Sequence, residues 1–452
     1  TLFMVVGRVT AYGWNHFRQQ VWPALRRGSL TLGGQAKAGG AAVLSAGRRT
    51  VQGLAQKRSG AAIPRFSWTG MRAWVSGLPR SSKIFAALAV LFAVALIVSL
   101  VLLRAKRAED ARIQAASEQL HAARVAKDAA GSALIYDNRE QAQKLLGEAT
   151  TLAAQVKASG LYQNEITSLE SDITRENDRL QKIVRASGES ARVVGSWSEL
   201  VNAGNDMELF AIGDTLFTYH PETNAVLKMD ASGKAERVTQ TTEGVGFFAT
   251  GIAQEADKTI LLATDAPGIA LFDSNDNSLL RQEIDLPSEQ SRIGALATFG
   301  SRLYLHDQVG GQLHVYNKTL RGYSGGEGWI TDESFPKDTI RSLAVDGNIF
   351  TLHSDGTVRR LFKGAPAEFA LAEVSPNLSG ASRIITSEEH QYLYVVDPAN
   401  ARVVIFTKEG ELSRQIFIQD ARNMQDAAVG PEENTLYVLD GTRVLQVPLS
   451  EE

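Results

Sequence analysis

Short apolar segments recur at a nearly constant spacing through the C-terminal part of the chain. Six of them, beginning at positions 216, 260, 303, 349, 393 and 436, read LFTYHP, ILLATD, LYLHDQ, IFTLHS, LYVVDP and LYVLDG. A strand pattern of small apolar residues precedes each segment, and a turn and a third strand pattern follow it. Four short strands in a period of about 44 residues are typical of one propeller blade. The pattern therefore predicts an all-β, six-bladed propeller over residues 191–452.

The two ends of this repeat region complement each other. The last blade stops after its third strand pattern at 442–449, whereas ARVVGSWSELV (191–201) stands before the first blade and has no blade of its own. Pairing of the two segments would close the ring and leave no free sheet edge. A β-sandwich is the competing fold, but a sandwich would not keep this period.

A second hydrophobic pattern, at residues 84–103, is apolar on every face. It reads IFAALAVLFAVALIVSLVLL, with Ser99 as its only polar residue and Lys83 and Arg104 at its ends. A helix of this length spans about 30 Å, the thickness of the hydrocarbon core of a bilayer. The segment begins too late and runs too long for a cleavable signal peptide. We therefore predict one transmembrane helix at 84–103 and a single-pass protein of the cell membrane.

Charge is distributed unevenly on the two sides of this helix. Residues 1–83 carry 13 Lys and Arg and no Asp or Glu, whereas residues 188–452 carry a net charge of −17. The positive-inside rule then predicts a cytoplasmic N-terminus and an extracytoplasmic propeller. Residues 28–62 are rich in glycine, alanine and serine, a composition typical of flexible linkers. Residues 1–83 are therefore predicted to be a basic, largely disordered linker. The acidic charge of the propeller argues against nucleic acid as a partner. The chain has no cysteine, which excludes disulfide bonds and thiol catalysis.

Residues 104–187 show the periodicity of amphipathic helices. The second of three helical stripes contains Ala142, Leu145, Ala149, Leu152 and Val156. Asp137 is predicted to cap this helix, Ser159 and Gly160 to end it, and the third stripe to run through 162–183. Such helices need a partner surface. The segment is therefore predicted to be a stalk, either a helical hairpin within one chain or a coiled coil that would make the protein a homo-oligomer.

The blade sequences resemble a known repeat family. YLYVVDPANARVVIFTKEGEL (392–412) is similar to an NHL-type blade, and NTLYVLDGTRVLQVP (434–448) is a looser variant. The order of basic segment, span, stalk and propeller is similar to that of receptor-type bacterial Ser/Thr kinases with extracytoplasmic sensor propellers. The resemblance implies a role in signal transduction, with a kinase or phosphatase domain preceding Thr1. No kinase or phosphatase motif is present in the chain itself.

Motifs that would carry chemistry are absent from the sequence. It contains no zinc-protease, nucleophile-elbow, phosphate-loop or EF-hand pattern. One aligned column holds a recurring acid or histidine: His220, Thr264 or Asp265, Asp307, His353, Asp397 and Asp440. We interpret this column as hydrogen-bonding to turns rather than as a metal ring. At the starts of the inner strands, Glu208 and Asp426 could bind a metal, but Thr250, Arg292 and Arg341 make a poor remaining shell. No catalytic residue, metal or cofactor is therefore predicted.

Three arginines and one tryptophan are the candidate ligand-binding residues. Arg292, Arg341 and Arg383 stand near the starts of inner strands, where they could bind an anionic group. Trp329 lies in the longest insertion between blades, and loops on a rigid scaffold often carry recognition. The sequence thus favours a non-catalytic sensor that binds a protein, peptide or glycan, and not an enzyme. The alternatives are an envelope scaffold or adhesion protein and, with less support, a propeller hydrolase or lactonase.

Overall fold

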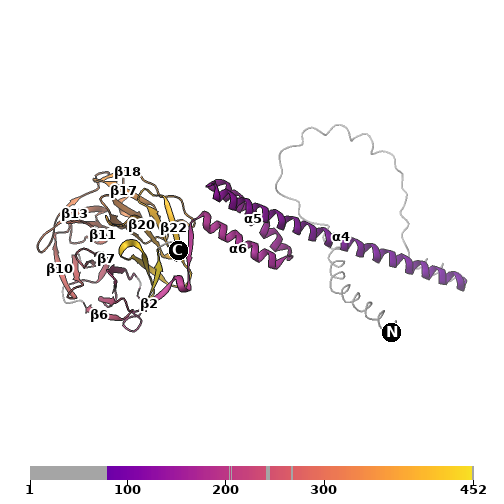
Figure 1. Cartoon of the computed structure of the whole chain (residues 1–452), viewed down its shortest axis with the longest axis horizontal. Coiled ribbons are helices and arrows are strands. Elements are labelled where there is room, and N and C mark those ends of the chain that lie inside the picture. Colours follow the sequence, from indigo (N-terminus) through magenta and orange to yellow (C-terminus); the bar gives the residue numbers. More distant parts are fainter. Residues whose placement is uncertain (1–78, 203, 205, 241–244, 266–267, 450–452) are drawn as a thin grey trace, which may run out of the picture. The chain divides into compact units, whose positions relative to one another are not determined.

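The structure, a computed structural model, describes residues 79–202, 204, 206–240, 245–265 and 268–449 (Figure 1). Contacts divide the chain into two units, Thr1–Val98 and Ser99–Glu452. The predicted linker at 1–83 lies outside the described residues except for its last five positions.

The apolar segment forms part of one long helix, α4 (Arg80–Ile135). Among the described residues this is the one helix that is long and apolar enough to cross a membrane, with a mean hydropathy of 2.7 over its most apolar 18-residue window. Large apolar side chains from Ile84 to Leu103 are all exposed, and no described residue buries them. Exposed apolar surface on every face is the property expected of a segment surrounded by lipid. The orientation of the helix stays a prediction.

The C-terminal part of α4 packs with α5 (Arg139–Ser159) and α6 (Gln163–Leu180). Their shared core contains Ala116, Leu120, Ala123, Ala126, Ala130, Leu146, Ala149, Ala153, Val156, Ile166, Leu169 and Ile173. Alanine dominates the side of α4 that faces the other two helices, so the backbones can approach closely. This core forms within one chain, as the helical-hairpin alternative predicts. Association between chains through a coiled coil stays a prediction.

Three details of the predicted stalk differ in the structure. Asn138, not Asp137, caps α5, because its side chain accepts a hydrogen bond from the amide of Gln141. In the second stripe, Leu146 and Ala153 are buried in place of the predicted Leu145 and Leu152, which are only partly buried. The third helix ends at Leu180, and Ile183 already belongs to a strand. The predicted end of α5 is confirmed, since Gly160 has a φ of 76° that favours glycine.

The remaining residues form an all-β propeller whose sheets surround a common centre (Figure 1). Its sheet orders are β3-β4-β5-β6, β7-β8-β9-β10-β14-β13-β12-β11, β15-β16-β17-β18, β19-β20-β21-β22-β1 and β23-β24-β25-β2. Consecutive strands pair antiparallel within each sheet. In the eight-stranded sheet, β10 and β14 are joined in parallel through two residue pairs.

The first strands are β1 (Ile183–Ala186), β2 (Arg192–Ser196), β3 (Leu209–Ile212), β4 (Thr215–His220), β5 (Ala225–Met229), β6 (Ala235–Gln240), β7 (Phe248–Gln254), β8 (Thr259–Thr264), β9 (Gly268–Asp273), β10 (Ser278–Ile284), β11 (Ile293–Phe299), β12 (Arg302–Asp307) and β13 (Gln312–Lys318). The others are β14 (Gly322–Gly328), β15 (Ile340–Val345), β16 (Ile349–His353), β17 (Val358–Phe362), β18 (Ala365–Ala367), β19 (Arg383–Ile385), β20 (Tyr392–Asp397), β21 (Arg402–Thr407), β22 (Leu412–Ile418), β23 (Met424–Val429), β24 (Thr435–Asp440) and β25 (Arg443–Pro448). Short 3₁₀ turns are η2 (Gly188–Ser190), η3 (Lys337–Thr339), η4 (Pro398–Asn400) and η5 (Pro431–Glu433).

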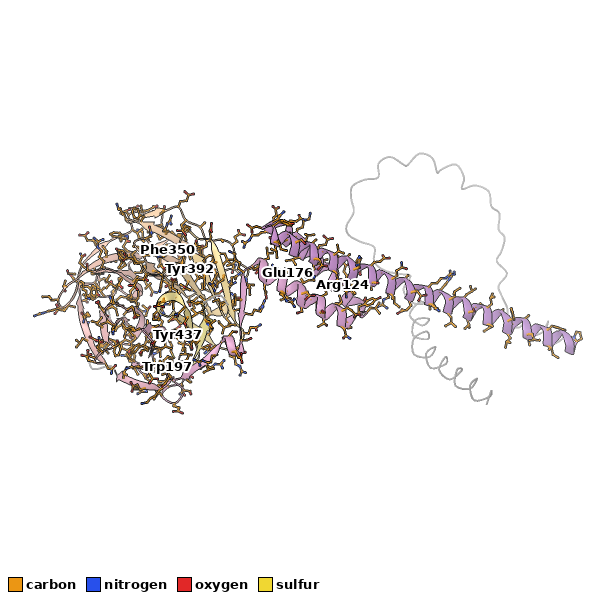
Figure 2. The ribbon with its side chains drawn as sticks, viewed as in Figure 1. Arg124, Glu176, Trp197, Phe350, Tyr392 and Tyr437 are labelled. Carbon is orange, nitrogen blue, oxygen red and sulfur yellow. The ribbon has the colours of Figure 1, made fainter. Side chains whose placement is uncertain are left out.

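The predicted pairing of the two ends of the repeat region is confirmed. Strand β2 pairs antiparallel with β25 and completes the sheet that the C-terminal strands leave open. Trp197, labelled in Figure 2, follows β2, is fully buried and donates its backbone N–H to the carbonyl of Thr442 at 2.8 Å. A further strand, β1, pairs in parallel with β22 and was not predicted. It directly follows α6, so the stalk continues into a sheet of the propeller.

The recurring acid or histidine column was predicted to bond the turn between the second and third strands, but it bonds mainly the segments that enter the inner strands. Asp307 accepts hydrogen bonds from the amides of Arg292 and Val309 and from the hydroxyl of Ser291. Asp440 likewise accepts from the amides of Arg422 and Asn423. Within the described part of the chain, no group of three or more His, Asp or Glu could hold a metal ion. Asp307 and Asp440 therefore hold the entry to the inner strand of their own blades.

His353 makes the stability of the propeller sensitive to acid. It is 2% exposed, hydrogen-bonds to the hydroxyls of Thr339 and Thr351, and burial lowers its pKa to about 4. The unfolded chain therefore binds more protons between pH 6.5 and pH 4, so stability falls as the pH drops through this range, by about 3 kcal/mol for this group. Urea unfolding at a series of pH values should show that H353Q flattens this dependence. His121→Gln, an exposed control on α4, should leave it unchanged, and an unaltered slope in H353Q would contradict the assignment.

Candidate functional site in the axial cavity

The inner strands β3, β7, β11, β15, β19 and β23 surround a cavity of about 1590 Å³. Small residues line much of its wall, including Ala211, Ala253, Ala344 and Ala428. The inner strands were predicted to be rich in small apolar residues, and this composition leaves the axis open. A cavity of this size exceeds what a small-molecule ligand requires. The polar groups on its wall decide what it can do.

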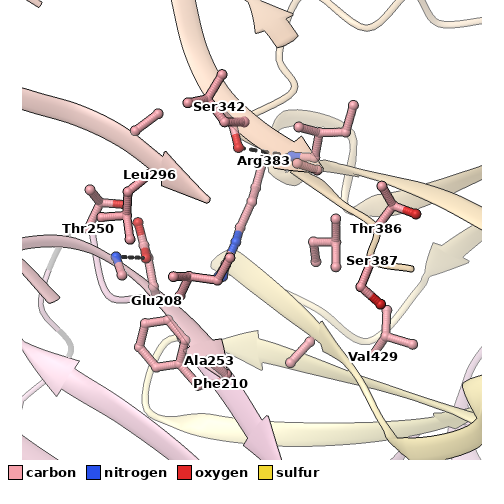
Figure 3. A pocket seen from close by; sticks show the side chains of 18 of the residues that line it. Glu208, Phe210, Thr250, Ala253, Leu296, Ser342, Arg383, Thr386, Ser387 and Val429 are labelled. Carbon is pink, nitrogen blue, oxygen red and sulfur yellow. Dashed lines mark hydrogen bonds between the residues drawn. The ribbon is translucent and has the colours of Figure 1, made fainter. Parts of the chain in front are cut away.

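Glu208 stands just before β3 and extends into the cavity (Figure 3). Its Oε2 accepts a hydrogen bond from the amide of Gly251 at 2.8 Å, and the hydroxyl of Thr250 lies beside it. Burial raises the pKa of Glu208 to about 7, the negative charge of Asp426 acts in the same direction, and the positive charge of Arg383 opposes both. A carboxyl group with this pKa exchanges a proton readily at neutral pH.

Arg383 and Asp426 form an ion pair beside Glu208. Nη1 of Arg383 donates to Oδ2 of Asp426 and, at 3.3 Å, to the carbonyl of Leu209. The guanidinium also lies 5.4 Å from the centre of the Phe210 ring. Burial raises the pKa of Asp426, and Arg383 counteracts this rise. Oδ1 of Asp426 is buried and has no hydrogen-bond partner in the described part of the chain.

These three side chains do not suit a resident metal ion. Two carboxylates converge, but the third charged group is Arg383, which already contacts Asp426 and supplies the positive charge. The neighbouring inner strand adds a threonine hydroxyl, that of Thr250, beside Glu208. The donor set thus lacks the third carboxylate or imidazole that a metal site needs. The positive charge of this cluster comes from the guanidinium.

The structure places the four predicted ligand-binding residues in different surroundings. Arg383 and Arg341 line the cavity, and Arg341 donates to the carbonyl of Ala381 at 2.7 Å. Arg292 is exposed and is not among the cavity-lining residues. Trp329 packs edge to face on Tyr304, with ring centres 5.6 Å apart. Of the four, Arg383 alone joins the polar cluster.

Glu208 and Asp426 were considered only as candidate metal ligands in an otherwise poor shell, and their pairing with Arg383 was missed. A signal existed, because Arg383 and Asp426 stand 43 residues apart, which is one repeat period. Oppositely charged residues at the starts of adjacent inner strands meet at the axis of a propeller. The three arginines were predicted to bind an anionic group, and their pairing with acids was not predicted.

No family model matches the chain, and no curated protein matches it either. Several solved structures are similar to part of it. A virginiamycin B lyase from Staphylococcus aureus is 10% identical, with 57% of this chain and 99% of that chain covered and a TM-score of 0.40. A gluconolactonase from Xanthomonas campestris is 13% identical, with 59% and 97% covered and a TM-score of 0.40. A chain of a mitotic checkpoint complex is 11% identical, with 57% and 91% covered and a TM-score of 0.42.

The prediction that the chain is not an enzyme is wrong. It was drawn from the absence of catalytic sequence motifs, but the structures similar to this one include a lyase and a gluconolactonase. At 10% and 13% identity and TM-scores of 0.40, this likeness does not transfer either activity to this chain. The question of activity is therefore decided by the residues of the axial cavity.

Proposed function

We propose that the chain is a membrane-anchored propeller hydrolase that cleaves ester or lactone bonds in its axial cavity. The observation that carries the proposal is Glu208, a carboxyl group with a pKa of about 7 that lies beside the guanidinium of Arg383 on the wall of a large cavity. Perturbed carboxyl groups in concave sites are typical of general acid–base catalysts. The ring is proposed to have six blades, with the eight-stranded sheet counting as two, and the N-terminus to be cytoplasmic.

Each residue of the cluster has a role in this reaction. The Glu208 carboxylate removes a proton from water while the water oxygen bonds to the carbonyl carbon of the substrate. Nη1 of Arg383 is engaged by Asp426 and Leu209, so the N–H groups of Nε and Nη2 are available to the developing oxyanion. The carbon–oxygen bond then breaks, and Glu208 returns the proton to the leaving alkoxide. Asp426 acts as a positioning residue that orients Arg383.

The proposal predicts metal-independent turnover. The full chain, purified in detergent, would be incubated with a panel of aliphatic lactones and p-nitrophenyl esters, and acid release would be followed by pH-stat titration. Because Arg383 supplies the positive charge, rates with and without EDTA are expected to agree within a factor of about two. Absence of turnover across the panel, or turnover abolished by EDTA and restored by a divalent cation, would contradict the proposal.

A further inference from the structure

A second cavity, apart from the axial one, lies between two neighbouring sheets of the propeller. Its volume is about 450 Å³. Its wall comes from β2, from β25, from the loop between β22 and β23, and from the segment that joins β1 to β2. Strands β1 and β2 are the outermost strands of their sheets, so this cavity lies on the outer side of the ring. None of its lining residues lines the axial cavity.

Positive charge dominates the outer cavity, although the propeller as a whole is acidic. Three of its nine lining residues are arginines, Arg192, Arg422 and Arg443, and Asp420 is the one acid among them. Residues 188–452 carry a net charge of −17, so this lining is opposite in sign to the average of the domain. A concave site lined by one sign of charge concentrates ligands of the opposite sign. The charge of the wall therefore favours an anion.

The three arginines differ in how far the protein already uses their charge. Arg443 donates from Nε to Oδ2 of Asp440 at 2.7 Å, so its charge is balanced. Arg192 is exposed and donates from Nη2 to the neutral amide oxygen of Gln446 at 3.1 Å. Arg422 is exposed as well, and its guanidinium has no hydrogen bond or ion pair with any described residue. Within the described part of the chain, two guanidinium groups of the cavity thus have no carboxylate partner.

Hydrogen bonds within the chain hold the wall of the outer cavity in place. Oδ2 of Asp420 accepts from the amide of Gly188 at 2.8 Å, and the carbonyl of Asp420 accepts from Nη2 of Arg443 at 2.6 Å. Gly188 belongs to η2, in the segment that leads from β1 into β2. These bonds tie that segment to the loop after β22 and to β25. The cavity is therefore formed before any ligand arrives, which lowers the ordering cost of binding.

We propose that the outer cavity binds a small, soluble phosphate monoester. Such a group carries a charge of about −1.5 to −2 at pH 7 and has three strong acceptor oxygens, which match two guanidinium groups without carboxylate partners. A carboxylate has one charge and two oxygens, and matches them less well. The volume of about 450 Å³ lies in the range of small-molecule pockets, so the organic part of the ester fits as well. The proposal does not depend on the hydrolytic function of the axial cavity.

Calorimetric titration of the full chain in detergent tests the site with glycerol 3-phosphate, glycerate and glycerol. Glycerol 3-phosphate is expected to bind at least about tenfold more tightly than glycerate, and glycerol is expected not to bind. R192Q and R422Q should each weaken glycerol 3-phosphate binding by about five- to tenfold, and the double variant should abolish it. R359Q, at an exposed position outside both cavities, should bind as the wild type does. Thermal unfolding of R422Q should match the wild type, because this guanidinium holds no described residue.

Three results would overturn the proposal. These are no binding of glycerol 3-phosphate at millimolar concentration, equal affinities for glycerol 3-phosphate and glycerate, and undiminished binding in the R192Q/R422Q variant.

A lipid headgroup offers the same phosphate chemistry, and a second titration separates the two sources. The full chain would be placed in nanodiscs of phosphatidylcholine that contain either phosphatidylglycerol, a phosphate diester, or phosphatidic acid, a phosphate monoester. Glycerol 3-phosphate is expected to bind equally well in both, because the ligand is soluble. Binding that is lost only with phosphatidic acid would show that lipid headgroups occupy the cavity, and would overturn the assignment to a soluble ligand.

Discussion

Replacement of Glu208 by glutamine is expected to lower kcat/KM for ester hydrolysis by about 10²–10⁴-fold, the usual contribution of a general acid–base group. Glutamine keeps the size of the side chain and an oxygen for the Gly251 amide, but it cannot accept and return a proton. The loss should therefore appear mainly in kcat. Steady-state kinetics on the full chain would measure it.

A matched control distinguishes catalysis from damage to the fold. Glu222 is exposed and does not line the cavity, so E222Q should retain wild-type rates. Thermal unfolding of E208Q is expected to occur at or above the wild-type temperature, because a buried carboxyl that resists ionisation is replaced by a neutral amide. If E208Q kept more than about a tenth of the activity, Glu208 would not be the general acid–base group.

Replacement of Arg402 by methionine is expected to destabilise the propeller by about 3–5 kcal/mol. Arg402 and its partner Asp397 are both fully buried, with Nε and Oδ2 2.8 Å apart. Arg402 also donates from Nη1 to Gln415 at 2.6 Å, and Gln415 donates in turn to the carbonyl of Gln181 after α6. The variant leaves a buried carboxylate without its cation, which is the main cause of the expected loss. Urea unfolding would measure the change in the free energy of unfolding.

An exposed ion pair provides the comparison for this prediction. Lys318 and Asp257 are 2.9 Å apart but about half exposed, so K318M should cost only about 0–1 kcal/mol. The double variant D397L/R402M should recover part of the loss, because it removes both charges. A cost for R402M no larger than that for K318M would show that the buried pair does not stabilise the propeller.

The propeller could be predicted because the same pattern of short strands recurs along the sequence. The positions of the inner strands followed from the period of about 44 residues. The pairing of β2 followed from the one unmatched segment at each end of the repeat region. Strand β1 could not be predicted in this way, because it pairs in parallel with β22 through contacts far apart in the sequence. In the stalk, the rotation that buries Leu146 in place of Leu145 depends on how three helices pack together, which a single helical stripe does not specify.

The site was predicted only in part for a similar reason. Arg383 was selected from its place at the start of an inner strand, and the structure puts it at the axis. Its partners come from the turn before β3 and from β23, so the cluster exists only when distant blades meet. The raised pKa of Glu208 has the same origin, since burial at the axis is a property of the closed ring and not of any one blade.

The pH dependence of kcat/KM in wild-type chain and in R383Q tests the central claim most directly. If Glu208 is the base, the wild-type rate should rise with pH through a midpoint near 7, because only the ionised carboxylate accepts a proton. Removal of the guanidinium that favours ionisation should move this midpoint to higher pH in R383Q. A flat wild-type profile, or an unchanged midpoint in R383Q, would contradict the account.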